Sequence, residues 1–94
     1  MRQVESASDF GAIIRKRRHE RNVTQGALAA RLGMSVSNLS RIEHGADLRV
    51  STLLDIAREL KLEPILVPKE LVPSVRGILS TTDADHDAER GRFA

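Results

Sequence analysis

Residues 25–44 read QGALAARLGMSVSNLSRIEH, and this stretch decides the fold. Its aliphatic residues recur at spacings that place them on the facing sides of two short helices: Leu28, Leu32, Leu39 and Ile42. Ala29 is small where the two helices would cross closely. Gly33 falls at the end of the first helix, where it can take the left-handed conformation without a Cβ penalty. The stretch therefore predicts two short helices joined by a tight turn.

Six constraints met at fixed spacing indicate a helix-turn-helix motif, and they are far more specific than a single glycine-based motif. Around the motif, short oxygen side chains that can cap a helix precede apolar runs at helical spacing. The helices are expected to start after these caps: Asp9 (or Ser8), Thr24, Ser35 and Ser51. An all-α domain of four to five helices is therefore expected over residues 9–62.

The character of the sequence changes after Leu62. Residues 63–68 read EPILVP, a short aliphatic run between two prolines, which predicts one edge strand. A lone strand leaves its backbone groups unpaired, so we expect it to pair with its own copy across a dimer. Residues 69–79 form a short apolar extension, and the polar, acid-rich residues 80–94 are expected to be a disordered tail.

Composition sets the broad class of the protein. The 94 residues suffice for one domain, and with 40% hydrophobic residues but only two aromatic ones the core should be aliphatic. The lack of cysteine excludes a disulfide scaffold and cysteine-based metal sites. No segment approaches the roughly 20 apolar residues that span a bilayer, and the polar N-terminus lacks a signal-peptide core. We expect a cytoplasmic protein with no membrane partner.

Nothing in the sequence points to an enzyme. His19, His44 and His86 are scattered without ligand spacing, and we find neither a paired nucleophile and base nor a glycine-rich phosphate loop. We therefore expect no catalytic residues, no metal and no cofactor.

Positive charge gathers in the first half of the chain. Residues 10–50 hold eight basic and three acidic side chains, a net charge of +5, whereas residues 51–94 hold six basic and eight acidic ones, a net charge of −2. This asymmetry favours a polyanionic partner such as DNA for one part of the chain. The alternative is a solvated charged surface without a partner.

Residues 23–45, VTQGALAARLGMSVSNLSRIEHG, resemble the Cro-type phage-repressor family of helix-turn-helix domains, also called the xenobiotic-response-element (XRE) family. The resemblance covers residues 9–62. It implies a five-helix domain that binds double-stranded DNA with residues 35–44 in the major groove. It also implies a buried ion pair between Arg18 and Glu43, in which each charge requires the other.

The resemblance further implies where the chain contacts DNA. By position in the family motif, base readout falls to Val36, Ser37, Asn38 and Arg41. Their chemistry is suitable, since Asn pairs with adenine, Arg with guanine, and Val contacts a thymine methyl. Phosphate contacts fall to Gln25, Ser40, His44 and Arg49, with Lys16 and Arg17 at longer range. The alternatives are solvent-facing side chains and, for Arg41, a phosphate contact.

The segment LKLEPILV, residues 60–67, makes the chain similar to HipB-type antitoxins, whose helical domain ends in a strand that pairs across the dimer. Here that strand would comprise Ile65, Leu66 and Val67. The resemblance implies a homodimeric repressor that reads an inverted-repeat operator, autoregulates its operon and binds a HipA-like kinase toxin. Phe93 in the tail is a candidate partner contact, with an irrelevant terminus as the alternative. Two other functions stay open, a stand-alone regulator without a toxin and a protein-interaction adaptor.

Overall fold

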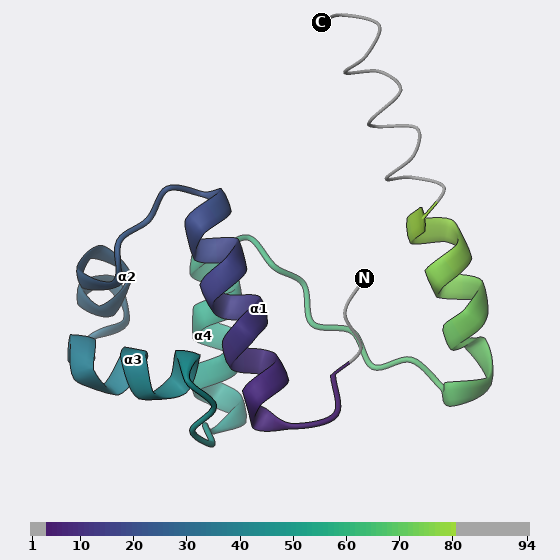
Figure 1. Ribbon diagram of the computed structural model, residues 1–94, viewed down its shortest axis with the longest axis horizontal. Helices are drawn as coiled ribbons and strands as arrows, with labels where there is room; N and C mark the ends of the chain where they lie inside the picture. Colours follow the sequence, from purple (N-terminus) through teal and green to yellow (C-terminus); the bar gives the residue numbers. More distant parts are fainter. Residues whose placement is uncertain (1–3, 81–94) are drawn as a thin grey trace, which may run out of the picture. The chain divides into compact units, whose positions relative to one another are not determined.

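The computed structural model describes residues 4–80 (Figure 1). Its elements are the helices α1 (Ala7–Glu20), α2 (Gln25–Leu32), α3 (Val36–Glu43) and α4 (Val50–Glu59), the 3-10 turn η1 (Lys69–Leu71), and a helical stretch over residues 72–80. The chain divides after Pro64 into an N-terminal unit, which holds α1 to α4, and a C-terminal unit that begins at Ile65. The expected all-α helix-turn-helix fold is confirmed.

The two helices of the motif begin at the caps that the sequence predicts. The Oγ1 atom of Thr24 accepts the backbone N–H of Ala27 at 3.0 Å, and the Oγ atom of Ser35 accepts that of Asn38 at 3.0 Å. Between the two helices, Gly33 ends α2 with φ 67°, in the left-handed region that favours glycine. The direction in which α3 leaves the turn is therefore set by local hydrogen bonds and by this glycine.

The starts of α1 and α4 differ from the expectation. Helix α1 begins at Ala7 with Ser6 as its N-cap, and Asp9 lies in the first turn, where its Oδ2 atom accepts the Ser6 N–H at 3.1 Å. Helix α4 begins at Val50 with Arg49, rather than Ser51, as its N-cap. At α1, Ser6, Ser8 and Asp9 lie within four residues of one another, so residue type alone does not single out the cap.

The core of the N-terminal unit is aliphatic, as the composition predicts. Its largest fully buried side chains are Ile14, Leu28, Leu39, Ile56 and Leu60. Helix α3 packs against α1 and α2, and α4 packs against α2. Burial of each such side chain stabilises the fold by about 1.5–3 kcal/mol. One face of α3 is thereby fixed in the core, while its other face is left to solvent.

Helix α1 approaches the end of α3 so closely that only glycine fits at the contact. Gly11 is buried, and a Cβ atom added there would lie 2.8 Å from the carbonyl oxygen of Glu43 and closer still to that of Ile42. Both obstacles are backbone atoms, which cannot rotate away as the end of a side chain can. This requirement for glycine at the crossing of α1 and α3 was not predicted from the sequence.

The strand that the sequence predicts over residues 63–68 is not present in this single chain. These residues have no regular secondary structure, and no strand occurs in the described residues 4–80. A strand needs a neighbour to pair its backbone groups, and one copy of this segment supplies none. The apolar extension over residues 69–79 is helical, as η1 and then residues 72–80.

The tail beyond Ser80, with Phe93, lies outside the described residues. Among the helices of the described part, none has the length and apolar character needed to cross a membrane.

We predict that Gly11→Ala lowers the free energy of unfolding by about 1–3 kcal/mol, since the added methyl group meets backbone oxygens of α3. Urea denaturation followed by circular dichroism measures this. Gly26→Ala in α2 is the matched control, because the nearest atom to its added Cβ is 4.0 Å away. It should be neutral or slightly stabilising. Equal stability of the two variants would contradict the close crossing.

Candidate nucleic-acid interface

Helix α3 has one buried face and one exposed face. Leu39, Ile42 and Glu43 are buried, whereas the side chains that the family resemblance assigns to base readout are exposed: Val36, Ser37, Asn38 and Arg41. Because residues at i, i+3 and i+4 share a helix face, Ser37, Asn38 and Arg41 form a continuous surface. A helix with this exposed face has the size and polarity to enter a DNA major groove.

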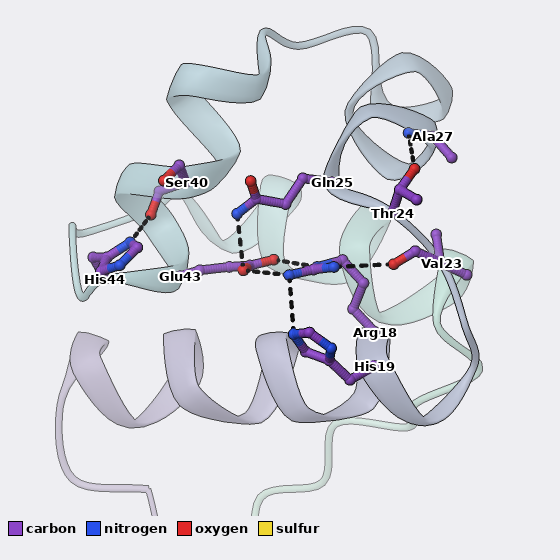
Figure 2. A network of polar contacts seen from close by, with 9 residues as sticks. All are labelled: Arg18, His19, Val23, Thr24, Gln25, Ala27, Ser40, Glu43 and His44. Carbon is purple, nitrogen blue, oxygen red and sulfur yellow. Dashed lines mark hydrogen bonds and ion pairs between the residues drawn. The ribbon is translucent and has the colours of Figure 1, made fainter.

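The structure brings Arg18 and Glu43 together in a buried, bidentate ion pair (Figure 2). The Nε atom of Arg18 donates to Oε2 of Glu43 at 2.7 Å, and its Nη2 atom donates to Oε1 at 3.0 Å. The side chains are only 9% and 1% exposed. Arg18 Nη1 also donates to the carbonyl oxygen of Val23 at 3.0 Å. One side chain of α1 thus links the end of α3 to the loop that precedes α2.

Gln25 joins the same network. Its Nε2 atom donates to Oε1 of Glu43 at 3.1 Å, so its side-chain amide ties the start of α2 to the end of α3 (Figure 2). The family resemblance implies a phosphate contact for Gln25, and the sequence did not predict this bond to Glu43. In the described residues, every buried side-chain nitrogen or oxygen has a hydrogen-bond partner. A buried ion pair is stable only under that condition.

The environment of Glu43 favours its ionised form. Burial raises the pKa of the Glu43 carboxyl, but hydrogen bonds from Arg18 and Gln25, together with the positive charges of Arg18 and Arg15, outweigh burial and leave the pKa below its ordinary value. Since the folded state lowers this pKa, ionised Glu43 stabilises the fold above the ordinary pKa of about 4.3. That contribution disappears as the pH falls through the lowered value.

The residues assigned to phosphate contacts divide into two groups. His44 is exposed, and its Nδ1 atom lies 2.7 Å from the carbonyl oxygen of Ser40, which holds the ring at the end of α3. Arg49 is exposed at the start of α4, and Lys16 is exposed on α1. These side chains are available to a ligand on the surface of the N-terminal unit.

Arg17, by contrast, is engaged within the fold. Its Nε atom donates to the carbonyl oxygen of Leu60 at 2.9 Å, and its side chain is 29% exposed. Its Nη1 atom also lies 3.6 Å from Oε2 of Glu20. Arg17 therefore links α1 to the end of α4, a contact between residues 43 positions apart that the charge pattern did not reveal.

A shallow hollow of about 400 Å³ lies between α3, the loop that follows it and the start of α4. Asn38 and Arg41 line it from α3, and Asp47 and Arg49 line it from the other side. Within the described residues, no group of three or more His, Cys, Asp or Glu side chains is arranged to hold a metal ion. The hollow thus has two arginines, one asparagine and one carboxylate among its polar lining groups.

Comparisons with known proteins find the same fold. A helix-turn-helix family model, HTH_3, matches residues 14–67. An uncharacterised HTH-type transcriptional regulator of Sinorhizobium fredii, y4dL, is 39% identical over 75 residues, which are 79% of this chain and 38% of the relative. The chain thus spans well under half of that relative's length.

Solved structures are similar as well. A chain of a HipB-O4 20mer complex superimposes with a TM-score of 0.65 at 20% identity, over 73% of this chain and 99% of that chain. A chain of a HipA-HipB-O2-O3 complex gives a TM-score of 0.64 with the same identity and coverage. At this level of identity the likeness shows the fold.

We predict that Glu43→Gln lowers the free energy of unfolding at pH 7 by about 3–5 kcal/mol, because it leaves the Arg18 charge buried and unpaired. The difference from the native protein should shrink as the pH falls from about 4.3, the ordinary pKa of glutamate, through the lowered pKa of folded Glu43, where the native side chain becomes protonated too. Denaturation at a series of pH values measures both effects.

The control is Asp55→Asn, which removes an exposed ion pair to Arg58 with side chains 57% and 73% exposed. It should change stability by no more than about 0.5 kcal/mol. A Glu43→Gln variant as stable as this control at every pH would contradict the stabilising role of the buried pair.

Proposed function

This chain belongs to the XRE-type helix-turn-helix family, and on that premise we propose that it is a sequence-specific repressor that binds double-stranded operator DNA as a homodimer. One observation carries the proposal. The end of α3 is held by a buried ion pair, while the opposite face of the same helix presents Ser37, Asn38 and Arg41 to solvent. A helix so held can offer a fixed set of hydrogen-bonding groups to base edges.

In the proposed complex α3 lies in the major groove. Arg41 and Asn38 contact polar base edges, Ser37 contacts a base or the adjacent backbone, and Val36, which is 46% exposed, contacts a thymine methyl. Phosphate contacts come from Ser40, His44, Arg49 and Lys16, and from the start of α2 at Gln25. Arg17 contributes charge at longer range. The basic character of residues 10–50 supports this assignment.

We assign dimerisation to residues 63–68. Ile65 is 73% exposed and Leu66 fully exposed, so this segment offers apolar side chains and unpaired backbone groups to a second copy. Pairing of two such segments would form the strand that one chain does not have. A two-fold dimer then places two copies of α3 on an inverted repeat, with half-sites about 34 Å apart or a multiple of that distance.

An antitoxin role is the finer form of this proposal. The structural similarity to chains of the HipB and HipA-HipB complexes supports a HipA-like kinase toxin as a further partner. A stand-alone regulator without a toxin remains the alternative, and the relative described as a transcriptional regulator favours it. Co-purification of a kinase-like protein encoded beside this chain would separate the two. A protein-interaction adaptor would show the same weak binding to every DNA sequence.

We predict that the protein binds the DNA upstream of its own gene about a thousandfold more tightly than a scrambled duplex at physiological salt. Fluorescence anisotropy across a salt series measures this. Arg41→Ala should cost about 1–3 kcal/mol on the specific duplex and much less on the scrambled one. Arg49→Ala, the control for phosphate contact, should weaken both alike and reduce the salt slope by about one. Equal, weak binding to both duplexes would contradict a sequence-specific repressor.

The native protein should be a dimer at micromolar concentration. We also predict that the double change Ile65→Asp and Val67→Asp makes it monomeric with unchanged helicity, because carboxylates of the two copies would repel each other where the segments pair. Analytical ultracentrifugation and circular dichroism measure the two properties. Leu54→Asp, on the exposed side of α4, is the control and should leave the dimer intact. A native protein that is monomeric at micromolar concentration would refute this assignment, and loss of helicity in the double variant would place the segment in the monomer core.

A further inference from the structure

Two of the proposed base-reading side chains are hydrogen-bonded to each other. Arg41 Nη2 donates to Oδ1 of Asn38, one helical turn earlier on the exposed face of α3. The backbone of Asn38 is itself fixed, since its N–H donates to the Ser35 cap at 3.0 Å. The bond therefore anchors the long Arg41 side chain to a well-held position at the start of the helix.

This bond changes which base Asn38 can recognise in the major groove. An asparagine that recognises adenine accepts the N6 amino hydrogen with Oδ1 and donates to N7 with Nδ2. Here Oδ1 already accepts a charged donor, so an adenine amino group brought to it would face the Arg41 guanidinium. The groups left over are the N–H donors of Asn38 Nδ2 and of Arg41. Oδ1 keeps a second lone pair, but a donor brought to it would lie beside the positively charged guanidinium, so the two side chains together present mainly donors.

A surface of donors matches one purine best. In the major groove guanine offers two acceptors, O6 and N7, and no donor, whereas adenine sets an amino donor beside its N7. We propose that Asn38 is a positioning and specificity-determining residue, which holds the Arg41 guanidinium on a guanine in each half-site and does not read an adenine of its own. The inference rests on the proposed function, because it concerns the same face of α3.

The hollow beside α3 also contains a carboxylate that could bind the Arg41 guanidinium in place of Asn38. Asp47 lines it together with Arg41 and Asn38, and its Oδ1 atom accepts the N–H of Leu48 at 2.9 Å. Asp47 is the acidic residue that lines this hollow, and a guanidinium that is released from Asn38 and bonds to its carboxylate would be drawn away from the groove. Asn38 thus keeps Arg41 on the side of α3 that is proposed to face DNA.

The test begins with the full chain and the operator that it selects from random duplexes. Binding of the native protein and of Asn38→Ala, Arg41→Ala and the double variant is then measured by anisotropy. The duplexes are the selected operator and versions in which each guanine is replaced in turn by adenine or by 7-deazaguanine, which lacks the N7 acceptor. Thermal melting checks folding, which neither exposed side chain should affect.

We expect Asn38→Ala and Arg41→Ala to lose discrimination at the same guanine, each by about tenfold to a hundredfold. The double variant should be no worse than Arg41→Ala alone. Asn38→Asp retains an acceptor for Arg41, so it should keep the preference for guanine over adenine while its overall affinity falls. Adding Asp47→Asn to Asn38→Ala should recover part of the discrimination, since this change removes the carboxylate that would draw Arg41 into the hollow.

Three results would overturn the inference. One is a loss of discrimination at two different base pairs in the two single variants, and another is additive losses in the double variant. The third is a dependence on Asn38 that maps to an adenine. In each of these cases the native protein would still bind its operator specifically, and the proposed function would stand. If the native protein selects no sequence at all, the proposed function and this inference fail together.

Discussion

The buried ion pair between Arg18 and Glu43 is the constraint on which the rest of this structure depends. It joins the end of α3 to α1 at 2.7 Å, and through Val23 and Gln25 it also holds the loop before α2 and the start of α2. Burying two charges costs several kcal/mol each unless every donor and acceptor is matched, and here they are matched. An apolar pair could give a similar stability, but it would not fix the direction of α3 through two parallel hydrogen bonds.

Gly11 lets this pair form. Because it lacks a Cβ, α1 approaches the carbonyl oxygens at the end of α3, and the Arg18 side chain, two turns further along α1, reaches Glu43. The consequence appears on the opposite face of α3, where Asn38 and Arg41 are presented on a helix whose position is set by contacts behind it. The stability of the N-terminal unit and the proposed recognition of DNA thus depend on the same helix, which has a charged, buried end and a polar, exposed face.

The sequence predicts a structural feature well when the contacts that form it join residues close together in the chain, and poorly when they join residues far apart. The turn at Gly33 and the caps of α2 and α3 were predicted, because each involves residues within a few positions. The bond from Arg17 to Leu60 was not, since a charge run on a helix does not show which arginine folds back onto a distant carbonyl. Likewise Gln25 fits a phosphate contact by position, and only the fold shows its amide on Glu43. A single chain has no strand over residues 63–68, and the pairing proposed for this segment needs a second copy, so one chain cannot display it.

We propose that the exposed face of α3 enters DNA while the end that holds the Arg18–Glu43 ion pair stays in the protein. Amide chemical-shift mapping of the ¹⁵N-labelled protein, titrated with the operator duplex that it selects, tests this most directly. We expect the largest chemical-shift changes at Ser37, Asn38 and Arg41, with little change at the buried residues Ile56 and Leu60. Shifts concentrated on α4 or on residues 65–80, with α3 unmoved, would contradict it.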